Sequence, residues 1–378
     1  MIARTADFPG NGPPVMGPGE VEQVRYAPTG HLVYGQGLRV MAVPFDLRSL
    51  TLRGSPVPVV DSVIRGQGGG AVSFAISQTG VLAYAPEGLH QLAWVGRDGR
   101  ATVISPDRDK FRFPALSPDG KRVAVVIVSE ARQSHIWIYD AESGRKTKLT
   151  EEAISPRWTP DGTRVAFCGG TTTSLTWRMA DGSGTQDFMF SGRQRCPTSW
   201  SSDGGTLLVN RFDDPTTKVD VWALRREAHD TSTRALLTQS FNEADAKFSP
   251  DDRWVAYVSD ESGRYEVYVM SYPALKGRTA ISTDGGARPV WSRDGHELFY
   301  RQGTAIMAVS VRTGQEFHAD KPRLLFDGPY VGQGGDISFD VAPDGRFLMV
   351  TGDEASLGRQ LNVVTNWFTE LQQRVPTR

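Results

Sequence analysis

A short turn motif recurs eight times along the chain and constrains its fold more than any other feature. The motif has the form Ser-Pro-Asp-Gly or a close variant, such as SPDG ending at Gly120 and TPDG ending at Gly162. The eight copies end at Gly30, Gly80, Gly120, Gly162, Gly204, Asp252, Gly295 and Gly345, at intervals of about 45 residues. Self-similarity at a period of this length is typical of repeat architectures.

Each copy of the motif predicts a tight turn between two antiparallel strands. Proline presets φ for the first central position, and glycine supplies the positive φ that closes a hairpin. The residue four positions before the last turn residue is large and apolar in every copy: Tyr26, Ile76, Leu116, Trp158, Trp200, Phe248, Trp291 and Val341. After the turn, apolar residues alternate with period two, as at Val123 and Val125, which indicates a strand with one buried face.

A third strand follows in each copy, and several copies continue into a short fourth. Four strands in about 45 residues are typical of a β-propeller blade. The sequence therefore predicts an all-β propeller of four-stranded antiparallel blades, with eight blades, or alternatively seven or an incompletely closed ring. The last copy shows three clear strands, so its outer strand has to come from residues 368–375, from the N-terminal leader or from a segment upstream.

The first 20 residues differ in composition from the rest. They contain four Pro and four Gly, which is typical of a leader or linker. We therefore expect a leader at 1–20 and a single propeller domain at 21–378. Residues 368–375 are the only stretch with a helical pattern.

Charge and hydropathy exclude several classes of protein. The formal net charge is -1, with 42 Lys and Arg against 43 Asp and Glu, which argues against a nucleic-acid partner. The longest aliphatic run is Val123 to Val128, far short of the roughly 20 residues of a membrane span, so no membrane insertion is expected. The start does not resemble a secretory signal. Cys168 and Cys196 stand far apart without a CxxC motif and are expected to be free thiols.

Two parts of the motif carry a family resemblance. The turn and strand SPDGKRVAV at 117–125, followed by IWIYDAESG at 136–144, resemble the TolB-like, WD-repeat-related propellers of bacteria. More narrowly, residues 26–60, 74–86 and 248–269 resemble the propeller that follows the kinase domain in certain bacterial receptor-type serine/threonine kinases. The resemblance covers about 21–367 and implies a sensor or interaction domain, with no catalytic residues to transfer. It would place the chain outside the cytoplasm if it is the tail of such a kinase; otherwise the compartment is unknown.

No catalytic constellation is visible in the sequence. The glycine-rich loop, HRD and DFG motifs of kinases are missing, as is the G-x-S-x-G of serine hydrolases. The six histidines are scattered without HExxH or HxH spacing, so no metal and no cofactor are expected.

A binding site is expected at the mouth of the propeller channel, on loops that lead from one blade to the next. Arginines there could hold a carboxylate or phosphate, and two glycine-rich loops, GQGGG and GQGGD, have the same motif. The candidate residues are Arg112, Arg195, Glu243, Asp245, Arg288, Gln67, Gln333 and Asp336.

These observations predict a non-catalytic recognition module, a monomer that binds a protein or peptide partner, with a small-molecule ligand as a further option. The sensor part of a serine/threonine kinase system is the narrower hypothesis. The alternative is a hydrolase or lyase at the channel mouth, and this alternative predicts convergent polar groups with shifted pKa values in the channel.

Overall fold

The structure is a computed structural model that describes residues 21–64, 72–129, 133–169, 174–185, 187–190, 195–214, 217–226, 231–330, 339–352 and 360–377. The chain divides into two compact units. Unit 1 comprises Met1–Leu89, Glu130–Arg132 and Asp353–Arg378, and unit 2 comprises His90–Ser129 and Gln133–Gly352. No helix in the described part of the chain is long and apolar enough to cross a membrane.

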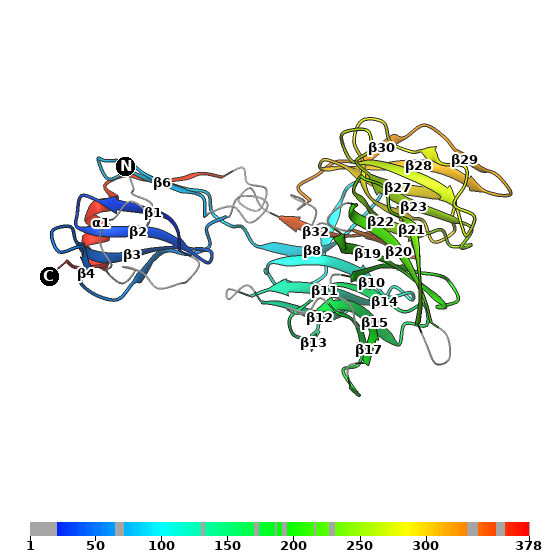
Figure 1. The fold of residues 1–378 in the computed structure, drawn as a ribbon, viewed down its shortest axis with the longest axis horizontal. Coiled ribbons are helices and arrows are strands. Elements are labelled where there is room, and N and C mark those ends of the chain that lie inside the picture. The colour runs from blue at the N-terminus through cyan, green and yellow to red at the C-terminus, as the bar shows by residue number, and fades with distance from the viewer. Residues whose placement is uncertain are drawn as a thin grey trace. The chain divides into compact units, whose positions relative to one another are not determined.

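Unit 2 contains six antiparallel sheets among the described residues (Figure 1). The first three are β10 (Phe111–Leu116), β11 (Arg122–Val128), β12 (Ser134–Asp140) and β13 (Lys146–Thr150); β14 (Ala153–Trp158), β15 (Arg164–Gly169), β16 (Ser174–Met179) and β17 (Asp187–Phe190); and β18 (Arg195–Trp200), β19 (Thr206–Asp214), β20 (Lys218–Arg226) and β21 (Thr231–Leu237).

The next two sheets are β22 (Glu243–Phe248), β23 (Trp254–Ser259), β24 (Glu266–Ser271) and β25 (Thr279–Ala280); and β26 (Ala287–Trp291), β27 (Glu297–Gln302) and β28 (Ala305–Thr313), with β29 (Phe317–Ala319) and β30 (Arg323–Phe326) both paired to β28. The sixth sheet has the order β31 (Asp340–Val341), β32 (Phe347–Gly352), β8 (His90–Val95) and β9 (Ala101–Val103).

The six sheets close into a ring. The first strand of each sheet contacts the first strand of the next, in the cyclic order β10, β14, β18, β22, β26, β31 and back to β10. The Trp158 indole donates a hydrogen bond to the Ala115 carbonyl (3.0 Å), and the Leu116 amide donates to the Asp340 carboxylate (2.9 Å). Buried aromatic and aliphatic side chains fill the space between neighbouring sheets, as around Phe167 and Trp158. The described residues of unit 2 therefore form a β-propeller of six blades.

Two repeats exchange their third strands. In the sequence, β8 follows β7 (Leu82–Tyr84) of the second repeat, and β33 (Asn362–Val364) follows β32 of the eighth. In the structure, β8 pairs with β32, and β33 pairs with β7. The sixth blade is thus assembled from both ends of the unit 2 chain, so the first and last strands hold the ring closed.

The predicted hairpin turns are confirmed. The last turn residue has positive φ in all eight copies, for example 73° at Gly120 and 54° at Asp252. In five blades a Ser or Thr hydroxyl before the turn donates to the turn Asp, as Ser117 Oγ does to Asp119 at 2.6 Å. This hydrogen bond is the main reason that the pKa of the Asp119 carboxyl is lowered. The hydroxyl and the Asp therefore serve the turn.

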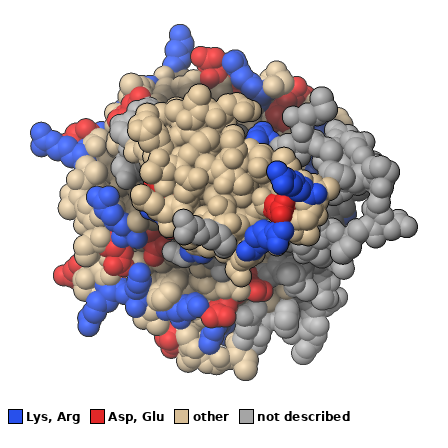
Figure 2. Space-filling view, turned by 90° about the vertical axis from the view of Figure 1, so that its left-hand side faces the viewer, with Lys and Arg blue, Asp and Glu red and all other residues tan. Residues whose placement is uncertain are grey.

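Unit 1 holds the first repeat, the first two strands of the second repeat and the third strand of the eighth. One sheet contains β1 (Val21–Ala27), β2 (His31–Gln36), β3 (Arg39–Asp46), β4 (Thr51–Leu52) and β5 (Val57–Val60), and the other has the order β33, β7, β6 (Phe74–Ile76). The expected helix is α1 (Trp367–Arg374), whose Trp367 and Leu371 are buried against both sheets. The His31 imidazole, also buried, donates to the Val375 carbonyl at 2.6 Å. Figure 2 shows a space-filling view in which uncharged residues gather near the centre and charged residues lie mainly around them.

The structure differs from the expected architecture in the number of blades in the ring and in the number of compact units. An eight-bladed ring over one domain at 21–378 was expected, whereas the eight described sheets are divided, six in the ring and two in unit 1. The repeat motif specifies a sheet, and it carries no information on which sheets become neighbours. The leader at 1–20 lies outside the described residues.

The expectation of free thiols is wrong as well. Cys168 in β15 and Cys196 in β18 form a disulfide, with Cα atoms 4.9 Å apart. The two residues are separated by 28 positions, but the repeat places their strands in adjacent blades. Sequence spacing alone could not show this proximity.

Candidate functional site

The first strand of most blades contains a bulge that directs a side chain into the channel. Seven positions before the end of the turn, the backbone is left-handed at Phe113 (φ 50°), Ser155 (55°), Asp245 (55°) and Arg288 (56°). The strand register shifts at each of these places. The equivalent residue of the third blade is Pro197, whose ring excludes positive φ. Left-handed non-glycine residues cost about 1–3 kcal/mol each, and such strain is concentrated at functional sites.

All five bulge residues line a cavity of about 520 Å³, which we call the mouth cavity. Its other lining residues are largely apolar. Two aromatic side chains at this cavity, Phe212 and Tyr265, are 43% and 45% exposed. The mouth cavity therefore combines a concave shape with exposed aromatic surface.

A second cavity of about 400 Å³, the central cavity, is lined by residues five positions before the end of the turn. These residues are Ala115, Arg157, Ser199, Lys247, Val290 and Asp340, one from each blade. The two cavities share Arg157, Thr198, Asp245 and Arg288 as lining residues. They therefore meet at one level of the propeller channel.

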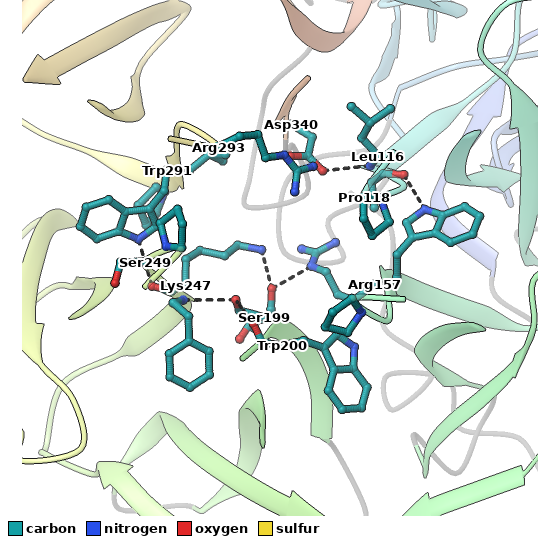
Figure 3. A pocket seen from close by; sticks show the side chains of 18 of the residues that line it. Leu116, Pro118, Arg157, Ser199, Trp200, Lys247, Ser249, Trp291, Arg293 and Asp340 are labelled. Atoms are coloured by element: carbon teal, nitrogen blue, oxygen red, sulfur yellow. Dashed lines mark hydrogen bonds between the residues drawn. The ribbon is translucent and has the colours of Figure 1, made fainter. Parts of the chain in front are cut away.

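Two cations converge at this level. Figure 3 shows Arg157 from β14 and Lys247 from β22 pointing toward one another. Arg157 Nε donates to the Thr198 carbonyl at 3.0 Å, and Lys247 Nζ donates to the same oxygen. Arg157 Nη1 also donates to the Pro156 carbonyl at 2.7 Å. Among the described residues neither cation forms an ion pair. Both donate hydrogen bonds to the same neutral acceptor, the Thr198 carbonyl.

The acidic residues nearby already have partners. The Asp340 carboxylate accepts hydrogen bonds from the amides of Leu116 (2.9 Å) and Val341 (2.8 Å). The Asp245 carboxylate forms an ion pair with Arg288 at 2.7 Å, and both side chains are largely buried. The channel therefore has excess positive charge where Arg157 and Lys247 meet.

Burial and this excess charge change the acid–base properties of Lys247. Desolvation, followed by repulsion from Arg157, lowers the pKa of Lys247 to about 7. Desolvation also lowers the pKa of Arg157, although Asp340 and Asp245 oppose the effect. Perturbed groups of this kind in a cavity are typical of functional sites.

The structure places only some of the predicted site residues at the two cavities. Asp245 and Arg288 are brought together and line both cavities. Glu243 is buried and accepts a hydrogen bond from the Gln239 amide at 2.9 Å, and burial raises its pKa. Arg195 lies over the Trp222 ring, 5.9 Å from its centroid, and Arg112 in β10 is paired with Val126 in β11. Neither arginine lines the mouth cavity or the central cavity. Gln67, Gln333 and Asp336 lie outside the described residues.

Sequence reasoning missed Arg157, Lys247 and Asp340. The sequence contains a signal for these three residues. Neighbouring residues of a strand face opposite sides, and the residue four positions before each turn end is apolar. The residue five positions before the turn end is therefore expected to face the other side of the strand. Counting five positions back would have selected all three.

The part of the chain that the structure describes contains no group of three His, Cys, Asp or Glu residues arranged to hold a metal ion. Cys196 also lines the mouth cavity, where its disulfide to Cys168 joins two blades. The site is built from cations, backbone carbonyls, aromatic rings and the carboxylates of Asp245 and Asp340.

The closed ring of antiparallel sheets defines unit 2 as a β-propeller. Its fold is that of a TolB-like propeller: a putative TolB from Agrobacterium tumefaciens superposes with a TM-score of 0.57 at 16% identity, covering 71% of this chain and 99% of that one. TolB from Acinetobacter baumannii has a TM-score of 0.48 at 16% identity, covering 86% of this chain and 79% of that one.

No family model matches the chain. One curated relative is an uncharacterized peptidase, YuxL, from Bacillus subtilis, which is 26% identical over 207 residues. The match covers 42% of this chain and 31% of that protein, so this chain spans about a third of the length of that relative.

Proposed function

We propose that the unit 2 propeller is a recognition module that binds a protein or peptide partner at the mouth cavity. The observation that carries this proposal is the pair of exposed aromatic rings, Phe212 and Tyr265, on a concave and mainly apolar cavity. Exposed apolar surface rimmed by polar groups is typical of interaction sites, and aromatic residues are enriched there.

The chemistry of the lining residues supports binding rather than hydrolysis. No histidine lines either described cavity. The hydroxyls of Ser201, Ser249 and Ser292 donate to the aspartates of their own turns, and the pKa values of these aspartates are lowered, so their carboxylates are weak bases for activating a serine.

The narrower role that we propose is the sensor part of a bacterial serine/threonine kinase system. It is supported by the resemblance of the repeat to kinase-linked propellers and by the disulfide, since disulfides persist in oxidising compartments outside the cytoplasm. Sequencing the genomic DNA on the 5′ side of the codon for Met1 tests this role. A kinase domain and a membrane span in the same reading frame would support it, and an unrelated gene followed by a promoter would overturn it.

A peptide selection tests the binding role. A library of random 12-residue peptides is selected against the full chain and then titrated against the Phe212→Ala/Tyr265→Ala double variant. We expect at least tenfold weaker binding to this variant. Leu324→Ala is the matched control, because Leu324 is 59% exposed on β30 and lies outside both cavities. Equal binding by all three proteins would contradict a role for the mouth cavity.

An enzyme with its site in the channel is the second candidate. Convergent polar groups with shifted pKa values are expected in this case, and Arg157 and Lys247 have both properties. A lysine with a pKa of about 7 could act as a general base. Turnover of a selected peptide, or of an acidic oligosaccharide, that is lost in Lys247→Met would favour the enzyme.

A further inference from the structure

We propose that the central cavity binds a carboxylate carried by a peptide, held between Arg157 and Lys247, while the residues next to it pack on the mouth cavity. The inference rests on the proposed recognition function and adds the chemistry of the group that is recognised. The carboxylate can come from a peptide C-terminus or from an acidic side chain, and the experiment below distinguishes these sources.

The hydrogen bonds of the two cations leave room for such a ligand. Lys247 Nζ has three N–H groups, and the structure shows one acceptor for them, the Thr198 carbonyl. The guanidinium of Arg157 has five N–H groups and is shown donating to the carbonyls of Thr198 and Pro156. Both acceptors are neutral carbonyls, so among the described residues neither cation donates a hydrogen bond to a carboxylate.

The two cations also repel one another, and this repulsion favours an anion between them. Both side chains lie inside the ring but keep part of their surface open to the channel. A carboxylate that bridges them would accept charge-assisted hydrogen bonds from both, and the planar fork of Arg157 matches its two oxygens. Neither Asp340 nor Asp245 takes this place, because the first accepts two backbone amides and the second pairs with Arg288.

The shape of the channel favours a peptide over a free anion. Arg157, Thr198, Asp245 and Arg288 line both cavities, so a ligand seated on Arg157 extends directly into the mouth cavity. Phe113 and Ile154 line that cavity together with the exposed aromatic rings of Phe212 and Tyr265. Apolar side chains of a peptide could bury surface there, whereas a free phosphate or acetate could not.

Binding of a carboxylate should be coupled to proton uptake. The charged groups that face Lys247 are Arg157 from β14, Asp245 from β22, Arg288 from β26 and Asp340 from β31. An added anion stabilises the protonated lysine and raises its pKa from about 7. At pH 8 Lys247 is mostly neutral in the protein without ligand. Binding of the carboxylate is therefore accompanied by uptake of as much as one proton. The affinity for the carboxylate falls as the pH rises above 7.

Four pools of synthetic hexapeptides, rich in Leu and Phe, test the proposal by isothermal titration with the full chain. The pools carry a free C-terminus with or without Asp, or a C-terminal amide with or without Asp. We expect at least tenfold tighter binding of a carboxylate-bearing pool than of the amide pool without Asp. Tighter binding of the free-acid pool without Asp would show that the carboxylate comes from the peptide C-terminus. Tighter binding of the amide pool with Asp would show that it comes from a side chain.

Variants connect the effect to the two cations. Lys247→Met and Arg157→Met should each remove the preference for carboxylate, and Lys247→Arg should retain most of it. Arg25→Met is the matched control, because Arg25 occupies the same repeat position in unit 1 and is exposed. Titration of the unchanged protein at pH 8, in two buffers of different ionisation enthalpy, measures proton uptake even if a variant fails to fold.

Three results would overturn the proposal. They are equal binding of the four pools, binding without proton uptake at pH 8, and displacement of the peptide by inorganic phosphate at concentrations below those of acetate. If no pool binds and the Phe212→Ala/Tyr265→Ala variant behaves like the unchanged protein in the peptide selection, the recognition function itself is wrong. If peptides bind at the mouth cavity without a preference for carboxylate, only the present inference fails.

Discussion

The same repeat builds both units, yet it closes into a ring in only one of them. The first strand of unit 1, β1, has the bulge of the propeller blades, with Gln23 at φ 51° and a register shift between Glu22 and Arg25. In unit 2 the first strand of each blade contacts the first strand of the next blade. In unit 1 helix α1 packs on both sheets instead. A repeat therefore specifies how one sheet folds, and the neighbours of that sheet decide the architecture.

Trp367→Ala should have the largest effect on stability. The indole is almost fully buried between the two sheets of unit 1, so its loss should destabilise that unit by about 3–5 kcal/mol. Hydrogen exchange followed by mass spectrometry should show faster exchange in β2 and β7 and unchanged exchange in β11. Faster exchange in β11 as well would show that the two units unfold together.

Leu92→Ala tests the exchange of strands directly. Leu92 lies in β8, which follows the second repeat in sequence but is buried in the propeller core. We expect unit 2 to lose about 2–5 kcal/mol and unit 1 to be unaffected. Val363→Ala is the control, because Val363 lies in the exchanged partner strand β33 and is 57% exposed. Destabilisation of unit 1 by Leu92→Ala would contradict the exchange.

Removing the disulfide should affect unit 2 somewhat less. A cross-link over 28 residues restricts the unfolded chain, and its loss in Cys168→Ala/Cys196→Ala should cost about 2–4 kcal/mol. Urea unfolding, monitored by the fluorescence of the unit 2 tryptophans, measures this change. The unchanged protein treated with a reductant should behave like the double variant, and no effect of the reductant would count against the bond.

Glycine substitutions compare the turns of the two units at the scale of about 1 kcal/mol. Gly30 (φ 87°) in unit 1 and Gly162 (φ 67°) in unit 2 occupy the same repeat position, and an added Cβ would have ordinary contacts at 3.5 and 3.6 Å. Alanine at either position should therefore cost only the strain of its left-handed backbone, about 1 kcal/mol. Thermal unfolding of the two variants should show equal losses, and a larger loss at Gly30 would reveal a tighter turn in unit 1.

In alkaline solution, the smallest effect is expected from Lys247→Met. The pKa of Lys247 is about 7 in the folded protein and about 10.5 in the unfolded chain, so the unfolded state binds more protons between these values. Stability should therefore rise with pH across this window in the unchanged protein, and Lys247→Met should reduce this rise. The gain from the substitution should be greatest below pH 7 and vanish above about pH 10.5. A pH-independent gain would indicate a packing effect instead.

Most local features were predictable because they depend on neighbouring residues. The hairpins at the eight turns and helix α1 follow from the spacing of Pro, Gly and apolar residues. Asp245 and Arg288 were selected from the sequence as separate loop residues, and the structure joins them in one ion pair. The disulfide could not be read from Cys168 and Cys196, because their proximity depends on two blades lying side by side.

The sequence by itself determined that each repeat forms a sheet, since turn chemistry and period-two alternation act over a few residues. Only the tertiary structure decided that β8 pairs with β32 and β33 with β7, because these pairings join segments more than 250 residues apart through backbone hydrogen bonds that any sequence can make. The ring of six follows from that exchange. The channel in which Arg157 meets Lys247 follows from it in turn, because the two residues belong to different blades and come together only when the ring closes.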